Sequence, residues 1–219
     1  MRRLLNNLPL LTLLSSLFWS SYLYANDPSS TACASGSSTL VGCAISTSDI
    51  TYTITGDIDA DEDIRGIAFT AGADNNNLTL NGNISTESAL GISLSSADLN
   101  TINMTGNIST AGGNSGHGLF LLRSNTNTTN ITGNITTLGY ASLGLWFSSS
   151  DSNTTNITGN ISTSGEQSYG MYLLNSDFNT TNITGNTSTA GDYAHAVYLG
   201  NADSSSTTIN GNITTAGDN

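Results

Sequence analysis

The side chains that could take part in chemistry are few in this chain, and they are widely spaced. Its two histidines, His117 and His195, are 78 residues apart. Each directly precedes the Gly or Ala that opens a short apolar segment, so we expect both in one column of a repeat, about 14 Å apart at the usual strand spacing. A general acid–base pair needs hydrogen-bond contact, roughly 3 Å. The histidines therefore do not predict a catalytic dyad.

The carboxylates form two groups. Asp57, Asp59 and Asp61 match the start of a calcium-binding loop, but Glu62 stands where that loop needs Gly and Ala68 where it needs Glu. A solvated acidic segment is favoured, with weak calcium binding as the alternative; no other cofactor is predicted. The second group recurs once per repeat in a polar turn and comprises Asp74, Asp98, Asp151, Asp177 and Asp203, with Asn125 in one repeat. We interpret these residues as Asx-type turns, with cation binding by stacked carboxylates as the alternative.

Four aromatic residues recur at the middle position of an apolar segment and are the candidate binding residues: Phe120, Trp146, Tyr172 and Tyr198. Their neighbours on both sides have core parity, so the aromatic side chains should point outward. An exposed aromatic strip could stack on sugar rings or on a protein partner. The alternatives are self-stacking on a sheet face and burial under a loop.

These residues are positioned by an internal repeat. Gly-Asn-Ile or a close variant begins at Gly56, Gly82, Gly106, Gly133, Gly159, Gly185 and Gly211, at spacings of 26, 24, 27, 26, 26 and 26 residues. Apolar residues alternate with polar ones through each glycine, which predicts a strand. A second strand follows about ten residues later, and a short third strand is left open. Such units bury their apolar face only by stacking, so the sequence predicts an all-β parallel β-solenoid with Asn ladders.

Residues 1–25 are predicted to be a secretory signal peptide. Arg2 and Arg3 precede an apolar run of about 11 residues, shorter than the ~20 that span a bilayer, and Ala25 suits cleavage. Residues 26–50 then form an N-terminal cap segment. Cys33 and Cys43 lie there with nine residues between them, and export to an oxidising compartment predicts a disulfide between them. Residues 51–219 form seven repeats, the last one incomplete.

The net charge argues against nucleic acid as a partner. The 16 acidic residues all follow residue 25, where only Arg65 and Arg123 remain as cations. A surface of this kind repels phosphate backbones.

The signal peptide and repeats such as Asn179-Thr180-Thr181-Asn182-Ile183-Thr184-Gly185-Asn186 resemble the passenger region of Gram-negative autotransporters. They are also similar to other β-helical adhesins and haemagglutinin-like exoproteins. The resemblance covers residues 51–219 and implies a right-handed β-helix displayed at the outer membrane, often adhesive. Autotransporters end in a membrane β-barrel, which this sequence does not contain, so we expect a separate or missing barrel for export. Polysaccharide-lyase β-helices use calcium and basic residues, and the scarcity of cations disfavours such an enzyme.

The sequence therefore favours a non-catalytic adhesin or passenger domain at the outer-membrane surface or outside the cell. Its expected partner is a host or cell-surface glycan or protein, and self-association through the last coil is a further expectation. The alternative is a soluble polysaccharide- or ice-binding solenoid that uses a flat polar face, carrying Thr158, Asn160, Ser162 and their equivalents.

Overall fold

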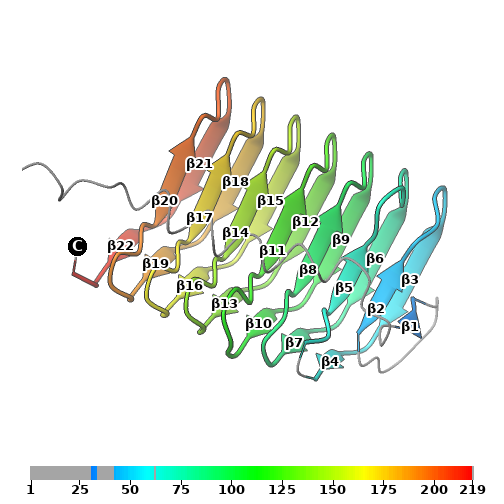
Figure 1. Cartoon of the computed structure of the whole chain (residues 1–219), viewed down its shortest axis with the longest axis horizontal. Helices are drawn as coiled ribbons and strands as arrows, with labels where there is room; N and C mark the ends of the chain where they lie inside the picture. The colour runs from blue at the N-terminus through cyan, green and yellow to red at the C-terminus, as the bar shows by residue number, and fades with distance from the viewer. Residues whose placement is uncertain (1–30, 34–41, 62, 219) are drawn as a thin grey trace, which may run out of the picture.

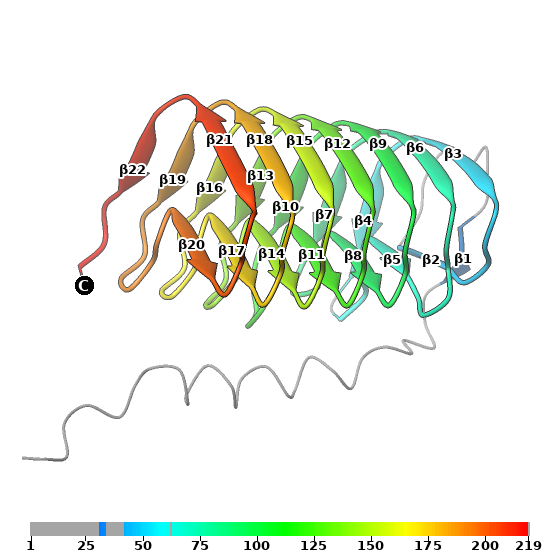
Figure 2. The ribbon, with the colours of Figure 1, turned by 90° about the horizontal axis from the view of Figure 1, so that it is seen from above.

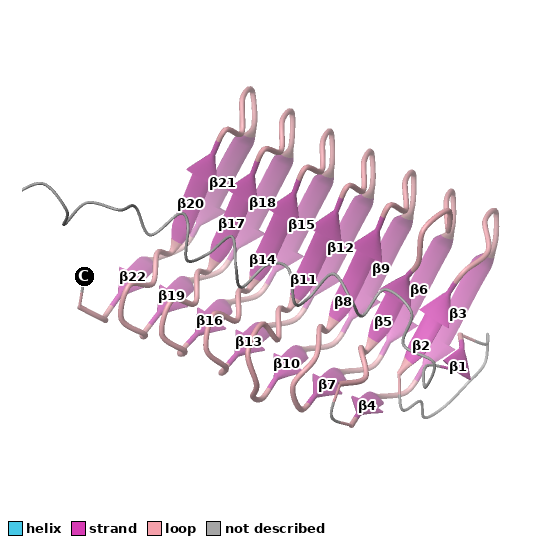
Figure 3. Ribbon diagram, in the orientation of Figure 1, coloured by secondary structure: helices cyan, strands magenta, loops and turns pink. Residues whose placement is uncertain are grey.

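The chain winds into a parallel β-solenoid of about seven turns, as its repeats predicted (Figure 1). The computed structural model describes residues 31–33, 42–61 and 63–218. Within these ranges the fold consists of strands and turns, with no helix (Figure 3). The predicted signal peptide at residues 1–25 lies outside the described residues, as does Glu62.

Each complete coil supplies one strand to each of three parallel sheets, which we call sheets A, B and C. Sheet A contains β1 (Thr31–Ala32), β2 (Cys43–Ile45), β5 (Ile67–Phe69), β8 (Ile92–Ser95), β11 (Leu119–Leu122), β14 (Leu145–Ser148), β17 (Met171–Leu174) and β20 (Val197–Gly200). Sheet B contains β4 (Ile58–Ala60), β7 (Ile84–Thr86), β10 (Ile108–Thr110), β13 (Ile135–Thr137), β16 (Ile161–Thr163), β19 (Thr187–Thr189) and β22 (Ile213–Thr215). Sheet C contains β3 (Thr51–Thr55), β6 (Asn77–Asn81), β9 (Thr101–Thr105), β12 (Thr128–Thr132), β15 (Thr154–Thr158), β18 (Thr180–Thr184) and β21 (Ser206–Asn210).

Equivalent residues of successive coils stand directly above one another. Ile157 of β15 pairs with Ile131 of β12 on one side and with Ile183 of β18 on the other. The same register holds in every sheet, so the 26-residue period of the sequence becomes a column of equivalent residues. Figure 2 shows the strands of successive coils stacked side by side. Neighbouring strands of a sheet are about 4.8 Å apart, which sets the spacing within a column.

The core is a continuous apolar file enclosed by the three sheets. Sheet C contributes residues such as Ile54 and Ile157, and sheet B contributes Ile58 and Ile161. Sheet A closes the coil with pairs such as Leu145 and Phe147, both fully buried. No repeat could enclose this surface alone, because each coil covers only the faces of its two neighbours.

The strand predicted to run through each glycine is in fact two strands in different sheets. The segment that contains Ile157 ends at Thr158 in sheet C, and Ile161 opens the next strand in sheet B. Gly159 lies between them with φ 149°, and a Cβ there would lie 2.1 Å from the carbonyl oxygen of Gly133. The prediction was wrong because apolar alternation continues across the corner, while the glycine allows the backbone to turn and stack closely.

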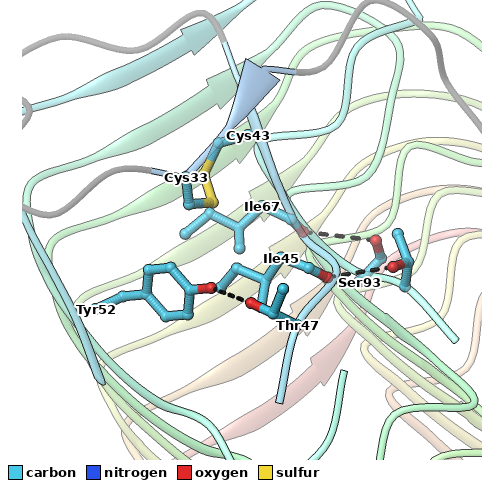
Figure 4. The surroundings of a disulfide bond; sticks show 8 residues. Cys33, Cys43, Ile45, Thr47, Tyr52, Ile67 and Ser93 are labelled. Atoms are coloured by element: carbon cyan, nitrogen blue, oxygen red, sulfur yellow. Dashed lines mark hydrogen bonds between the residues drawn. A yellow bond between two sulfur atoms is a disulfide. The ribbon is translucent and has the colours of Figure 1, made fainter. Parts of the chain in front are cut away.

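A disulfide closes the N-terminal end of the core. Cys33 and Cys43 are joined, with 4.8 Å between their Cα atoms, in agreement with the sequence prediction. Figure 4 shows the bridge above Ile67. Near it, the hydroxyl groups of Thr47 and Tyr52 share a hydrogen bond of 2.9 Å. The described part of the predicted cap segment thus packs on the first coil.

Candidate functional site

The aromatic column stands on the outer side of sheet A, but it is not exposed. Phe120, Trp146 and Tyr172 pair in register along β11, β14 and β17, with parity opposite to the core residues. Only 6%, 4% and 3% of their surfaces are exposed, and Tyr198 is half-buried. The predicted side of the sheet was right, whereas the predicted exposed strip was wrong. Parity fixes the side of a sheet that a side chain occupies, but not what packs against it.

The aromatic rings belong to a second apolar cluster, separate from the core. The ring centroids of Phe120 and Trp146 are 4.5 Å apart, and those of Tyr172 and Tyr198 are 5.0 Å apart. Leu90, Leu143 and Tyr169 pack beside them, and each lies one residue before the glycine that precedes a strand of sheet A. The column therefore packs on the outer side of sheet A, and the buried rings of Phe120, Trp146 and Tyr172 offer little exposed surface to a sugar.

The two histidines lie in equivalent positions of this second cluster but in different surroundings. His117 is buried, with its ring 4.7 Å from that of Trp146. Burial lowers the pKa of His117 to about 3. His195 is exposed and lies 5.0 Å from the ring of Tyr169. The two imidazoles contact different partners, so the structure brings no acid–base pair together at these positions.

Tyr172 is held in its neutral form in the same cluster. Burial raises its pKa to about 12, and charge repulsion with the ionised forms of Tyr198 and Tyr169 adds to the effect. Desolvation disfavours the phenolate because the charged oxygen would lose its water. A buried neutral phenol of this kind is a packing residue.

The Asp column forms a ladder between coils. The carboxylate of Asp151 accepts a hydrogen bond from the amide N–H of Asp177, 2.8 Å away, and that of Asp177 accepts one from Asp203 at 2.7 Å. Asp74 and Asp98 accept in the same way from the next coil. The Asx-turn interpretation was wrong in this respect, because the bonds join residues about 26 apart instead of residues of one turn. In the stacked repeat, the carboxylate of each Asp lies nearer to the amide N–H of the equivalent residue in the next coil than to an amide N–H of its own turn.

The Asn column at the corners is a similar exposed ladder. The side-chain oxygen of Asn160 accepts from the amide N–H of Asn186 at 2.8 Å. Asp57 occupies this column in the first coil and accepts from the amide and side chain of Asn83. Among the described residues, no three of His, Cys, Asp and Glu form a group that could hold a metal ion. The structure therefore gives Asp57, Asp59 and Asp61 no shared site.

A buried Asn column was missed by sequence reasoning. Asn153 is 1% exposed, and its side-chain oxygen accepts from the amide N–H of Asn127 at 2.8 Å. Its side-chain nitrogen donates to the carbonyl of Ser124 at 2.9 Å. Asn179 repeats both contacts one coil later. The signal was present as an Asn three residues before the Asn-Ile-Thr that ends β12, β15 and β18, but both asparagines look alike in the sequence.

The outer face of sheet C is an uncharged surface. Each of its seven strands has three outward side chains, and all 21 are Thr, Asn or Ser. None of the 21 is buried. From β9 to β18 the outward order is constant at Thr, Asn, Thr, so the outer face of sheet C is a regular array.

Hydrogen bonds fix the central rank of this array. The side-chain nitrogen of Asn156 donates to the side-chain oxygen of Asn130 at 2.9 Å, and Asn182 donates to Asn156 at the same distance. Threonine columns flank this rank on both sides. Side chains that are fixed before a ligand arrives lose less entropy on binding, so the array is preorganised.

The polar face predicted from Thr158, Asn160 and Ser162 is divided by the corner. Thr158 ends β15 on sheet C, Asn160 lies at the turn, and Ser162 points outward from sheet B. The prediction of a single flat face was wrong, because the backbone bends at Gly159. The flat surface consists instead of the whole of sheet C, including residues N-terminal to Thr158.

No family model matches the sequence, and no curated protein or solved structure is significantly similar to the chain. In the part of the chain that the structure describes, no helix is long and apolar enough to cross a bilayer.

Proposed function

We propose that this chain is an exported, non-catalytic adhesin or passenger-type β-solenoid that binds an uncharged cell-surface glycan through the outer face of sheet C. One observation carries this proposal: all 21 outward side chains of that sheet are neutral hydroxyl or amide groups in fixed columns. Hydroxyls and amides donate and accept hydrogen bonds, as sugar hydroxyls do. The signal peptide predicted for residues 1–25 supports display outside the cell.

The distribution of charge supports a neutral ligand. Acidic side chains such as Asp151, Asp177 and Glu166 lie in the turns that border the strands, and none lies on the outer face of sheet C. An anionic ligand would be repelled by these edges, and a cationic ligand would find no carboxylate on the face itself. A neutral polymer meets neither obstacle.

The test removes hydroxyl groups from the face without changing the fold. Thr132, Thr158 and Thr184 form one outward column, and all three are replaced by Val, which suits a strand. Binding to an array of immobilised neutral glycans should fall at least tenfold. The matched control makes the same replacement by Val at Thr136, Ser162 and Ser188 on the outer face of sheet B. This control should bind as the unchanged protein does.

Equal binding by both variants would contradict the choice of face. A strong fall in binding on addition of salt would contradict a neutral ligand, because screening weakens only charged contacts.

The soluble ice- or polysaccharide-binding alternative rests on the same array. Threonine columns run in register along both edges of the central Asn rank, with about 4.8 Å between coils. An ice-binding protein would shift the freezing point of its solution below the melting point. If the unchanged protein shows such a shift, the variant with Val at Thr132, Thr158 and Thr184 should abolish it. If the unchanged protein shows no shift, the glycan remains the proposed ligand.

A further inference from the structure

The core changes character halfway along the solenoid. One inward position of sheet C carries Tyr52, Leu78 and Ile102 in the first three coils. From the fourth coil the same position carries threonine, in the register Thr129, Thr155, Thr181 and Thr207. Thr187 likewise replaces the Ile161 of the preceding coil in sheet B. At this position of sheet C the second half of the core therefore carries small hydroxyl side chains, whereas the first half carries the larger Tyr52, Leu78 and Ile102.

Three of these hydroxyls are orphaned. Thr155, Thr181 and Thr187 are fully buried, and their Oγ1 atoms have no hydrogen-bond partner among the described residues. Other buried threonines differ: Thr137 and Thr163 each donate to a carbonyl oxygen at 2.7 Å. Burial without a partner is unfavourable, and valine has nearly the same shape without the hydroxyl. The repeated choice of threonine in consecutive coils therefore points to a polar partner inside the core.

The spacing of the column suits water. Successive hydroxyls in one column are about 4.8 Å apart, because that is the strand spacing. This distance is too long for a direct hydrogen bond, whereas a water molecule between two hydroxyls makes two bonds of about 2.8 Å each. Threonine is also smaller than the Leu78 or Ile102 that precede it in the column, which leaves room on the core axis.

We infer that ordered water molecules run through the C-terminal half of the core and bridge the successive hydroxyls of Thr129, Thr155 and Thr181. The next hydroxyl of the column, that of Thr207, donates to the sulfur of Met171 at 3.9 Å. Buried waters typically make about three hydrogen bonds to groups that otherwise lack partners. The inference is independent of the proposed glycan site, since these side chains point away from the outer face of sheet C.

The test compares the full chain with a Thr155→Val, Thr181→Val double variant. Magnetic relaxation dispersion counts water molecules that remain in the protein for longer than those of the surface, and a high-resolution crystal structure locates them. We expect density between the Oγ1 atoms of the column, a lower count in the double variant, and a lower melting temperature. Thr163→Val, which loses a protein partner instead of water, should keep the count unchanged.

An unchanged water count in the double variant, or a crystal structure without density between these hydroxyls, would overturn the inference. A double variant that fails to fold still leaves the crystal structure of the unchanged protein to decide.

Discussion

The amide N–H of Leu143 donates a hydrogen bond to Nδ1 of His117 across two successive coils, with 3.0 Å between the nitrogen atoms. Nδ1 can accept this bond only while it carries no proton. The contact therefore ties the packing of the second apolar cluster to the neutral form of one imidazole.

This relationship predicts an acid-sensitive stability. Burial lowers the pKa of His117 from 6.5 to about 3, so the unfolded chain binds a proton in this pH range that the folded chain does not. The stabilisation is complete above pH 6.5 and is lost as the pH falls toward 3, by about 1.4 kcal/mol per pH unit. When the pH is lowered from 6.5 to about 5, the free energy of unfolding should decrease in both proteins. The decrease should be about 2 kcal/mol smaller in His117→Leu than in the unchanged protein.

Denaturant titrations at several pH values measure this difference. Leucine already occupies the equivalent position at Leu90 and Leu143, so the variant should fold. His195→Leu is the matched control for the loss of an imidazole from this column, since His195 lies in the equivalent position but is exposed. An identical pH profile for His117→Leu would show that the imidazole is not buried.

The two Asn ladders should differ in their contribution to stability. Asn153→Ala leaves the buried amide of Asn127 and the carbonyl of Ser124 without partners, and should cost about 2–3 kcal/mol. Asn160→Ala removes an exposed bond that water can replace, and should cost about 1 kcal/mol or less. Equal losses in urea titration would mean that the buried column is hydrated.

The aromatic column should behave as a packing element. Trp146→Ala is expected to lower the free energy of unfolding by about 3–5 kcal/mol, because it leaves a cavity between Phe120 and Tyr172. Tyr198→Ala should cost less, since Tyr198 is only half-buried. A Trp146→Ala protein with unchanged thermal stability would show that the column is an open strip after all.

The corner glycine should tolerate no side chain. In Gly159→Ala the new Cβ would meet the carbonyl of Gly133, and we expect a loss of at least about 3 kcal/mol. Gly72→Ala is the control, because its φ of 79° is also left-handed but no atom lies within 4 Å of the added carbon. That variant should lose only about 1–2 kcal/mol, the cost of the backbone conformation. Thermal unfolding followed by circular dichroism compares the two.

The repeat period and the core residues could be predicted because both depend on short-range alternation. The apolar alternation through each glycine predicted which residues of a coil share the core side, and Ile157 and Ile161, which belong to that set, are both buried. The corner between them could not be predicted, since parity continues through Gly159 and the left-handed φ that bends the chain leaves no signal except the glycine itself.

The candidate site was harder to predict for a different reason. Trp146 was placed on the correct side of sheet A, but its burial depends on neighbours such as Leu143 and His117 that come from a separate turn. Asn153 and Asn160 have the same side chain and neighbouring threonines or isoleucines, yet one is buried and the other exposed. The difference depends on where the backbone turns, which is a property of the coil as a whole.

The register of the ladders also makes the molecule adjustable in length. Asn153-Thr154 and Asn179-Thr180 hold the same place in successive coils, so removal of residues 154–179 would join one to the other with every column intact. Each such deletion or duplication would shorten or lengthen the solenoid by one strand spacing, about 4.8 Å. Unequal recombination between the repeats of a gene that encodes such coils can therefore change the length of the solenoid. No step of such a change requires a sequence whose protein cannot fold.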